Sequence, residues 1–340
     1  MHMFCSLVNV QFEIEDPHIF KSEQLSISKD TLEGFTLEDP LKEEDFLLND
    51  DLTQSIGKMD LGEYRRNEFL GTQYDISDVD LSQEDALIIK QSRKVSASLD
   101  MWLLALWLVK DHAVNTNILY THIYRWENSS TLRIKKENLT YMANGLHESV
   151  KINTEELERV HDWLSFVENY VVSKSNHPKK SSEEYLIENN YALDYGNLDE
   201  IYRSDDRISR ALIFVTAARN QAFLSAKIAN YISAIEALVT SDKGSLVMQA
   251  SERTAMIIGK DRAEKIRIHD ALREAYSTRS SYVHGDALKK TLEAKLKNIS
   301  VTTDDIVRRL IKEIISNHPE IAKLKGDKLT EWYKENFLFS

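Results

Sequence analysis

The sequence predicts an α+β N-terminal domain followed by an all-α helical bundle. Near the N-terminus, apolar and polar residues alternate with the period of two that is typical of a strand. From about Asp205 onward, apolar residues recur every three or four positions, as in helices. A chain of 340 residues also exceeds the roughly 250–300 residues at which single cores stop growing, so we expect two domains. Only 10 Gly and 4 Pro are present, which argues against a loop-dominated or fibrous protein.

Composition narrows the class of protein further. The single cysteine, Cys5, excludes an intrachain disulfide and a multi-cysteine zinc site, and it suits a reducing compartment. The longest apolar run, Met101–Val109, is too short for a membrane helix, which needs about 20 residues. The N-terminus has no basic region followed by an apolar stretch, so we expect no export signal. The sequence therefore predicts a cytoplasmic protein with no membrane segment.

The net charge of -12 is unevenly distributed. Residues 1–90 hold 7 Lys/Arg and 21 Asp/Glu, whereas residues 201–315 hold 20 Lys/Arg and 14 Asp/Glu. Because the local field at a site matters more than the total charge, the acidic total does not exclude nucleic acid as a partner. The two parts are either solvated faces of opposite sign, or an acidic part that moderates access to a basic groove.

The N-terminal domain is predicted at residues 1–150, as a mixed α/β regulatory or sensing domain. Residues 30–80 are acidic and broken by glycines, and we expect loops with short elements there. The other expected elements are a strand at Val8–Glu15, a short strand at Leu25–Lys29, a buried helix at Gln83–Val109, and two strands at Ile118–Trp126 and Thr131–Lys136.

Residues 151–200 are predicted to connect the domains. Asn153 with Glu156 three positions later forms the pattern of a capping box, so a helix begins there. Its apolar stripe is predicted to consist of Leu157, Val160, Leu164, Val167 and Val171. The most linker-like stretch is Ser173–Ser182, and we place the domain boundary there or slightly after it.

Residues 201–317 are predicted to form the bundle, and residues 318–340 a C-terminal tail that docks because it is rich in aromatic residues. Asp261 with Glu264 offers another capping box, and Gly285 is a natural stop. Short connections between the helices favour an antiparallel arrangement. The expected helices are Arg207–Thr240, Ser245–Ile258, Asp261–Gly285 and Thr303–Asn317, the last ended by His318-Pro319.

The third of these helices ends in a run of chemical interest, Arg279-Ser280-Ser281-Tyr282-Val283-His284-Gly285. At about 100° per residue, Arg279 falls on an apolar stripe with Tyr276, where an arginine is costly unless its donors find a carboxylate, carbonyl oxygens or an anion. His284 lies about 140° round the helix from Arg279. A loosened last turn would still let both head groups reach one groove.

These residues resemble the HEPN domain family (higher eukaryote and prokaryote nucleotide-binding), in which Arg-x4-His lies near a helix end. Within this family, the sequence is most similar to the Apea-like branch, which is associated with bacterial defence against phage. The resemblance covers about Asp205–Asn317. It rests on Ile235-Glu236-Ala237-Leu238, Glu252-Arg253-Thr254-Ala255 and the Arg279–Gly285 run.

The resemblance implies metal-independent cleavage of RNA at a composite site formed by two paired bundles, hence a homodimer in antiphage or abortive defence. His284 would be the acid/base, because imidazole exchanges protons near neutral pH. Arg279 would clamp phosphate, because a guanidinium stays charged and grips phosphate oxygens. Neither a metal nor another cofactor is required. Some HEPN toxins have x-Tyr after the histidine; Gly285-Asp286 stands here, so we infer no nucleotidyltransferase antitoxin.

Three further residues are supporting candidates. Glu236 would orient Arg279 or His284, unless it is an ordinary surface carboxylate. Arg253 would add positive potential, or form an ion pair with Glu252 or Glu236. Ser280 would hydrogen-bond substrate, and is otherwise unremarkable on a helix surface.

Other readings stay open at this point. Arg279 and His284 would also suit a structural role, as an arginine satisfied by a core carboxylate and a histidine near the terminal carbonyls. The protein would then be a non-catalytic HEPN-like dimer that binds nucleic acid or a nucleotide, or a structural protein-interaction module whose acidic first quarter docks a partner. Tyr120, Tyr124 and Trp126 would stack bases, or would pack in the core or at a domain interface. The sequence contains no GxxxxGK[ST], GxGxxG, HExxH or GxSxG motif.

Overall fold

The computed structural model describes residues 2–13, 36–38, 54–57, 59–60, 68–73, 84–123, 130–135, 139–171, 206–241, 244–285 and 290–338. These residues form two compact units. The first comprises described residues up to 139 together with 148–168, and the second comprises 140–147, 169–171 and 206–338. The predicted strand at Leu25–Lys29 and the predicted linker at Ser173–Ser182 lie outside the described residues.

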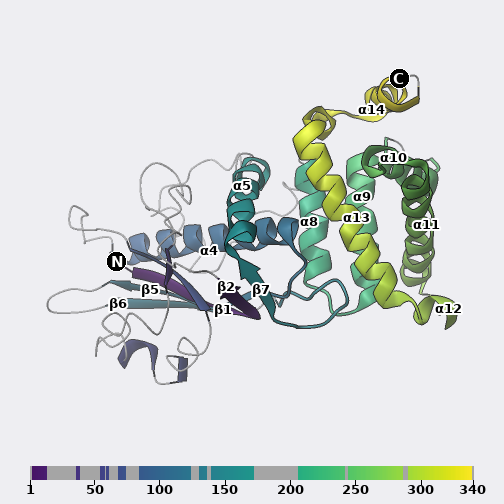
Figure 1. Cartoon of the computed structure of the whole chain (residues 1–340). Coiled ribbons are helices and arrows are strands. Elements are labelled where there is room, and N and C mark those ends of the chain that lie inside the picture. The colour runs from purple at the N-terminus through teal and green to yellow at the C-terminus, as the bar shows by residue number, and fades with distance from the viewer. Residues whose placement is uncertain are drawn as a thin grey trace. The chain divides into compact units, whose positions relative to one another are not determined.

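The first unit is built on a five-stranded antiparallel sheet, part of which is labelled in Figure 1. The order of its strands is β3-β4-β1-β5-β6. Two further strands, β2 and β7, pair in parallel. The strands are β1 His2–Val8, β2 Val10–Glu13, β3 Thr36–Glu38, β4 Glu68–Gln73, β5 Asn115–Ile123, β6 Ser130–Lys135 and β7 Val150–Asn153. A strand-bearing N-terminal part followed by helices therefore matches the predicted α+β layout.

The strand expected at Val8–Glu15 is wrong in one respect, because it is divided at Asn9. Val8 ends β1 and Val10 begins β2. Asn9 has a φ of 65°, in the left-handed region that asparagine tolerates better than most residues. Its side-chain amide donates to the Ala113 carbonyl at 3.0 Å, which fixes the turn. The alternation of apolar residues continues across the turn, so the sequence pattern hides it.

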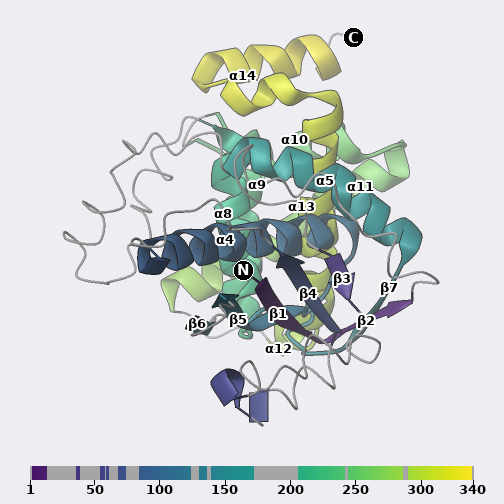
Figure 2. The ribbon, with the colours of Figure 1, turned by 90° about the vertical axis from the view of Figure 1, so that its left-hand side faces the viewer.

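Helix α4 (Glu84–Val109) lies along one face of the sheet (Figure 2). Its apolar end is buried, with Leu106 and Trp107 fully covered. The hydroxyl of Ser92 in α4 and the hydroxyl of Thr121 in β5 form a buried hydrogen bond of 2.6 Å, which ties the helix to the sheet. The helix predicted at Gln83–Val109 is thus confirmed, as is the predicted strand pair that the structure gives as β5 and β6.

Helix α5 (Thr154–Val171) begins with the predicted capping box. The Glu156 amide donates to Asn153 Oδ1 at 2.9 Å, and the Asn153 amide donates to Glu156 Oε2 at 3.2 Å. Both bonds satisfy amides that have no partner within the helix. The predicted stripe is buried at Leu157, Val160, Leu164 and Val167.

The second unit is helical, with α9 contacting α8, α10, α11 and α13 (Figure 1). The side chains of α9 that face these neighbours, including Ile228, Tyr231, Ile232 and Ile235, are fully buried. The helices are α8 Arg207–Arg219, α9 Leu224–Val239, α10 Leu246–Ile258, α11 Arg262–His284, α12 Lys290–Glu293, α13 Leu296–Asn317 and α14 Gly326–Tyr333.

Two predicted helix boundaries are corrected. The single helix expected at Arg207–Thr240 is two helices, because α8 ends at Arg219, with Asn220 as its C-cap, and α9 begins at Leu224. Small and apolar residues run on through this break, so the three- and four-residue period does not reveal it. The helix expected from Thr303 begins at Leu296. None of the described helices is long and apolar enough to cross a membrane.

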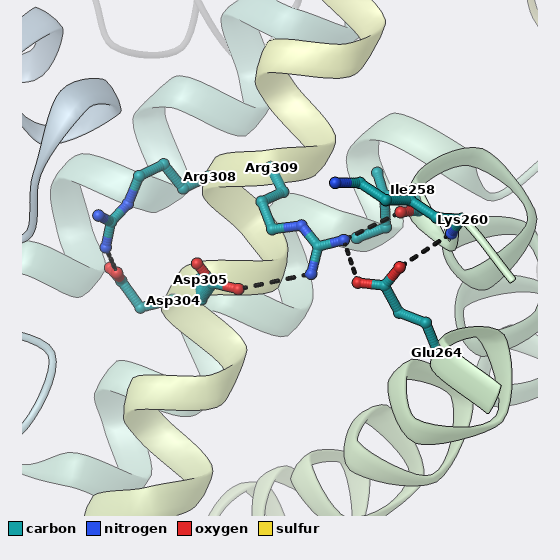
Figure 3. A network of polar contacts seen from close by, with 7 residues as sticks. All are labelled: Ile258, Lys260, Glu264, Asp304, Asp305, Arg308 and Arg309. Carbon is teal, nitrogen blue, oxygen red and sulfur yellow. Dashed lines mark hydrogen bonds and ion pairs between the residues drawn. The ribbon is translucent and has the colours of Figure 1, made fainter.

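A polar network ties the α10–α11 connection to α13 (Figure 3). Arg309 donates to the Ile258 carbonyl at 2.9 Å and to Glu264 Oε1 at 2.7 Å. The Lys260 amide donates to Glu264 Oε2 at 2.9 Å, and this bond, followed by that from Arg309, holds the pKa of Glu264 below its usual value. The Asp261 cap is formed, with the Glu264 amide at 2.8 Å.

The C-terminal segment packs on the bundle. It consists of η3 (Pro319–Lys323), α14 and η4 (Lys334–Leu338), and its apolar anchors Ile321, Leu329 and Tyr333 are buried. Trp332 lies edge-on to His318 at 5.2 Å between ring centroids. The aromatic residues of residues 318–338 are therefore used for packing within this unit.

Candidate functional site at the end of helix α11

Helix α11 stops at Gly285 for a backbone reason. Gly285 has a φ of 73°, and its amide donates to the carbonyls of Ser281 and Tyr282. This left-handed conformation costs a residue with a Cβ roughly 1–2 kcal/mol, and glycine nothing. The stop places Arg279 and His284 in the last two turns of the helix.

Arg279 faces helix α9, where Glu236 holds it. Arg279 Nη2 lies 3.2 Å from Glu236 Oε2, and the two side chains are 30% and 15% exposed. The other carboxylate oxygen, Oε1, accepts a hydrogen bond of 3.0 Å from the Tyr276 hydroxyl. Glu236 therefore bridges two residues of α11, and the partner that it orients is Arg279.

The surroundings of Tyr276 keep its hydroxyl protonated. Burial raises the pKa of the Tyr276 hydroxyl well above its usual value, and the Glu236 charge raises it further. Tyr276 thus stays protonated and donates to the carboxylate. The Arg279 guanidinium lies 5.9 Å from the centroid of the Tyr276 ring. Arg279 Nε is buried without a hydrogen-bond partner in the described part of the chain.

His284 and Ser280 lie on the other side of the helix, exposed to solvent. An ideal helix separates His284 from Arg279 by about 140° and from Ser280 by about 40°. Among the described residues, no hydrogen bond or ion pair joins His284 to Arg279. One chain therefore brings together Arg279, Glu236 and Tyr276, and separately His284 and Ser280.

Arg253 is engaged at the C-terminal segment. It donates to the Val239 carbonyl at 2.8 Å, to Ser241 Oγ at 3.2 Å and to Thr330 Oγ1 at 3.2 Å. Its guanidinium also lies 4.7 Å from the centroid of the Tyr333 ring. These contacts give Arg253 a role in attaching the segment, which the sequence pattern did not indicate.

Sequence reasoning also missed an exposed apolar patch beyond Arg279. Phe223, Tyr282 and Val283 are 60%, 43% and 59% exposed, and the two aromatic ring centroids are 5.9 Å apart. Tyr282 and Val283 are three and four positions after Arg279, so they share its side of the helix. Their apolar side chains at a helix end were the available signal.

The aromatic residue considered for base stacking in the first unit packs in the core. Tyr120 is 1% exposed and its ring stacks on Phe4 at 5.7 Å between centroids. Its hydroxyl donates to Asp60 and accepts from Arg133 Nε at 3.1 Å. Burial, with the Asp60 carboxylate, raises the pKa of Tyr120 to about 12. Tyr124 and Trp126 lie outside the described residues.

No group of three or more His, Cys, Asp or Glu side chains within the described ranges could hold a metal ion. Neither a protein-family model, nor a curated protein, nor a solved structure matches this chain. The residues at the end of α11 are therefore the basis on which a function can be proposed.

Proposed function

We propose that the protein is a metal-independent endoribonuclease of HEPN type that acts as a homodimer on RNA, in antiphage or abortive defence. One observation carries the proposal. Two turns of one helix present an arginine that a carboxylate holds in place and a histidine that is open to solvent. The resemblance of the Arg279–Gly285 run to HEPN sequences supports the same reading, and the acidic N-terminal part is the candidate for regulation.

The two residues would divide the chemistry of RNA cleavage. His284 would take the proton of the 2′-hydroxyl or protonate the leaving oxygen, which an exposed imidazole can do near neutral pH. Arg279 would bind the phosphate whose charge grows in the transition state. Ser280, one turn before His284 on the same face, would donate a hydrogen bond to the substrate.

Pairing of two chains would bring an Arg279 and a His284 close together, which the end of one helix does not do. Because Arg279 and His284 point about 140° apart, they do not converge on one phosphate within one helix end. Two copies with adjacent α11 ends would bring Arg279 of one copy beside His284 of the other. The predicted homodimer is therefore a requirement of the proposed mechanism.

The test is cleavage of total RNA in EDTA by the purified full chain. We expect His284→Ala and Arg279→Ala each to lower the rate at least about 100-fold, the size typical of a lost acid/base or charge-stabilising group. His269→Ala is the matched control, because His269 lies on the same helix beside Asp270 and should leave the rate unchanged. Equal cleavage by all four proteins would refute the proposal.

A non-catalytic dimer that binds nucleic acid or a nucleotide is the second candidate. The ion pair between Arg279 and Glu236 favours it, because a compensated arginine also has a purely structural use. In that case His284→Ala would leave both binding and phenotype intact, whereas changes that break the dimer would abolish them.

A further inference from the structure

Two arginines hold the last turn of helix α9. Arg207, which is 6% exposed, donates through Nη1 to the carbonyls of Ala237 at 2.9 Å and Thr240 at 2.8 Å. Arg253 donates to the Val239 carbonyl at 2.8 Å. The last carbonyls of a helix have no partner within it, and cations are favourable at that end. The end of α9 is thus capped by side chains from α8 and α10.

The same two arginines hold the C-terminal segment. Arg207 Nε donates to the Leu324 carbonyl at 2.6 Å, and Arg253 Nη2 donates to Thr330 Oγ1 at 3.2 Å. The Thr330 hydroxyl in turn donates to Ser241 Oγ at 2.8 Å, just after the end of α9. Each guanidinium therefore bonds both to the segment and to the end of α9. As a result, the position of the segment constrains the position of the helix end.

Arg207 keeps its charge at neutral pH. Burial lowers the pKa of Arg207 to about 10, with the nearby Arg210 as the next cause, and this value still leaves the group protonated. A buried guanidinium needs acceptors for its donors, or it loses the hydrogen bonds that offset its desolvation. If the segment left, Arg207 Nε and Arg253 Nη2 would each lose the acceptor described above.

The last turn of α9, which the two arginines hold, also lies next to Glu236 of the candidate site. Glu236 directly precedes Ala237, and its carbonyl accepts hydrogen bonds from the Thr240 amide at 3.1 Å and the Thr240 hydroxyl at 2.7 Å. Its carboxylate holds Arg279 at 3.2 Å. A short, continuous series of contacts therefore runs from Thr330 through the end of α9 to Arg279.

We propose that the docked C-terminal segment, residues 319–338, positions Arg279 by fixing the end of α9 and Glu236 with it. Thr330 and Arg253 are positioning residues in this account, because they act through Glu236. The effect on RNA cleavage rests on the proposed function, whereas the coupling between the segment and Arg279 does not.

The first experiment uses Thr330→Val, which removes the hydroxyl but keeps the side-chain shape. We expect hydrogen exchange of the amides of residues 237–241 to rise about tenfold or more, because their restraint from Arg253 and Ser241 is weakened. Thr330→Ser keeps the hydroxyl and should restore wild-type exchange. Thr302→Val is the control, since Thr302 is exposed on α13. Unchanged exchange in Thr330→Val would overturn the proposal.

The second experiment asks whether the effect reaches Arg279. In a double-mutant cycle, the shifts that Thr330→Val and Arg279→Met cause in the midpoint of unfolding should be non-additive if the two sites are coupled. Additive shifts would overturn the proposal even if the end of α9 were loosened. Both measurements remain decisive if the wild-type chain cleaves no RNA, an outcome that would remove the proposed function alone.

If the chain does cleave RNA, a third readout separates positioning from general stability. Thr330→Val should lower kcat several-fold with KM unchanged, below the temperature at which the variant unfolds, and Thr330→Ser should restore kcat. A kcat equal to that of wild type would show that the segment does not position Arg279.

Discussion

At the scale of single residues, the candidate site depends on the two partners of the Glu236 carboxylate. One carboxylate oxygen accepts from Tyr276 and the other lies against Arg279, and the carboxylate is largely buried. A buried carboxylate is tolerable only with such partners. The arrangement holds the guanidinium against Glu236 of α9 and leaves the Arg279 side chain 30% exposed, which suits both a phosphate clamp and a structural ion pair.

Tyr276→Phe should therefore cost stability out of proportion to its size. The change removes one oxygen and leaves Glu236 Oε1 without that donor, so we expect the free energy of unfolding to fall by about 1–3 kcal/mol. Urea unfolding at pH 7 measures the loss. Tyr282→Phe is the matched control, because Tyr282 is exposed at the same helix end and should change stability by less than about 0.5 kcal/mol. Equal losses for both variants would contradict the role given to Tyr276.

Alkaline pH should reveal the same buried hydroxyl. The pKa of Tyr276 is raised in the folded state from its unfolded value of 10.0. The hydroxyl therefore makes its full contribution to the free energy of unfolding below pH 10. Above pH 10 the unfolded chain releases the proton first, and stability falls as pH rises toward the folded pKa. We expect the free energy of unfolding to decline from pH 10 upward, and less steeply in Tyr276→Phe. Parallel declines in the two proteins would show that Tyr276 ionises normally.

At the scale of elements, the sequence predicts what local chemistry decides. The start of α5 at Asn153 and the stop of α11 at Gly285 follow from caps whose hydrogen bonds lie within a few residues. The break at Asn220 and the turn at Asn9 were missed because the apolar pattern continues across both. The capping of α9 by Arg207 and Arg253 was also missed, because it joins residues far apart in sequence.

Two glycines at helix ends should respond differently to substitution. Gly285 has a φ of 73° and open space around the site of a Cβ, so Gly285→Ala should cost about 1–2 kcal/mol and Gly285→Asn less. At Gly259 a Cβ would lie 2.5 Å from Lys265 Cγ and 2.6 Å from the Ala255 carbonyl oxygen. Gly259→Asn should therefore be no better tolerated than Gly259→Ala. Urea unfolding of the four variants checks this, and relief by asparagine at position 259 would contradict the steric reason.

At the scale of the whole molecule, the division between predicted and unpredicted features has a physical cause. Composition and periodicity report which residues are buried, and they predicted a strand-bearing N-terminal part followed by helices. They do not report which buried polar groups meet. Glu236 was a candidate because it ends a helix of the bundle, but its two partners follow only from the packing of α9 against α11.

The proposed composite site makes a prediction that only an assembly can fulfil. If Arg279 of one chain works with His284 of another, then inactive Arg279→Ala and inactive His284→Ala chains should restore activity when mixed. Half of the random dimers are mixed, and one of their two sites is intact, so recovery should approach about one quarter of wild-type activity. Refolding the two variants together and assaying RNA cleavage in EDTA measures it.

The control for this mixture is refolding of each variant alone, which should stay inactive. Native mass spectrometry of differently tagged chains establishes whether mixed dimers form. Mixed dimers without recovered cleavage would show that Arg279 and His284 do not combine across chains. Because an ideal helix holds the two side chains about 140° apart within one chain, that result would instead require the last turn of α11 to loosen, so that Arg279 and His284 of the same chain reach one phosphate.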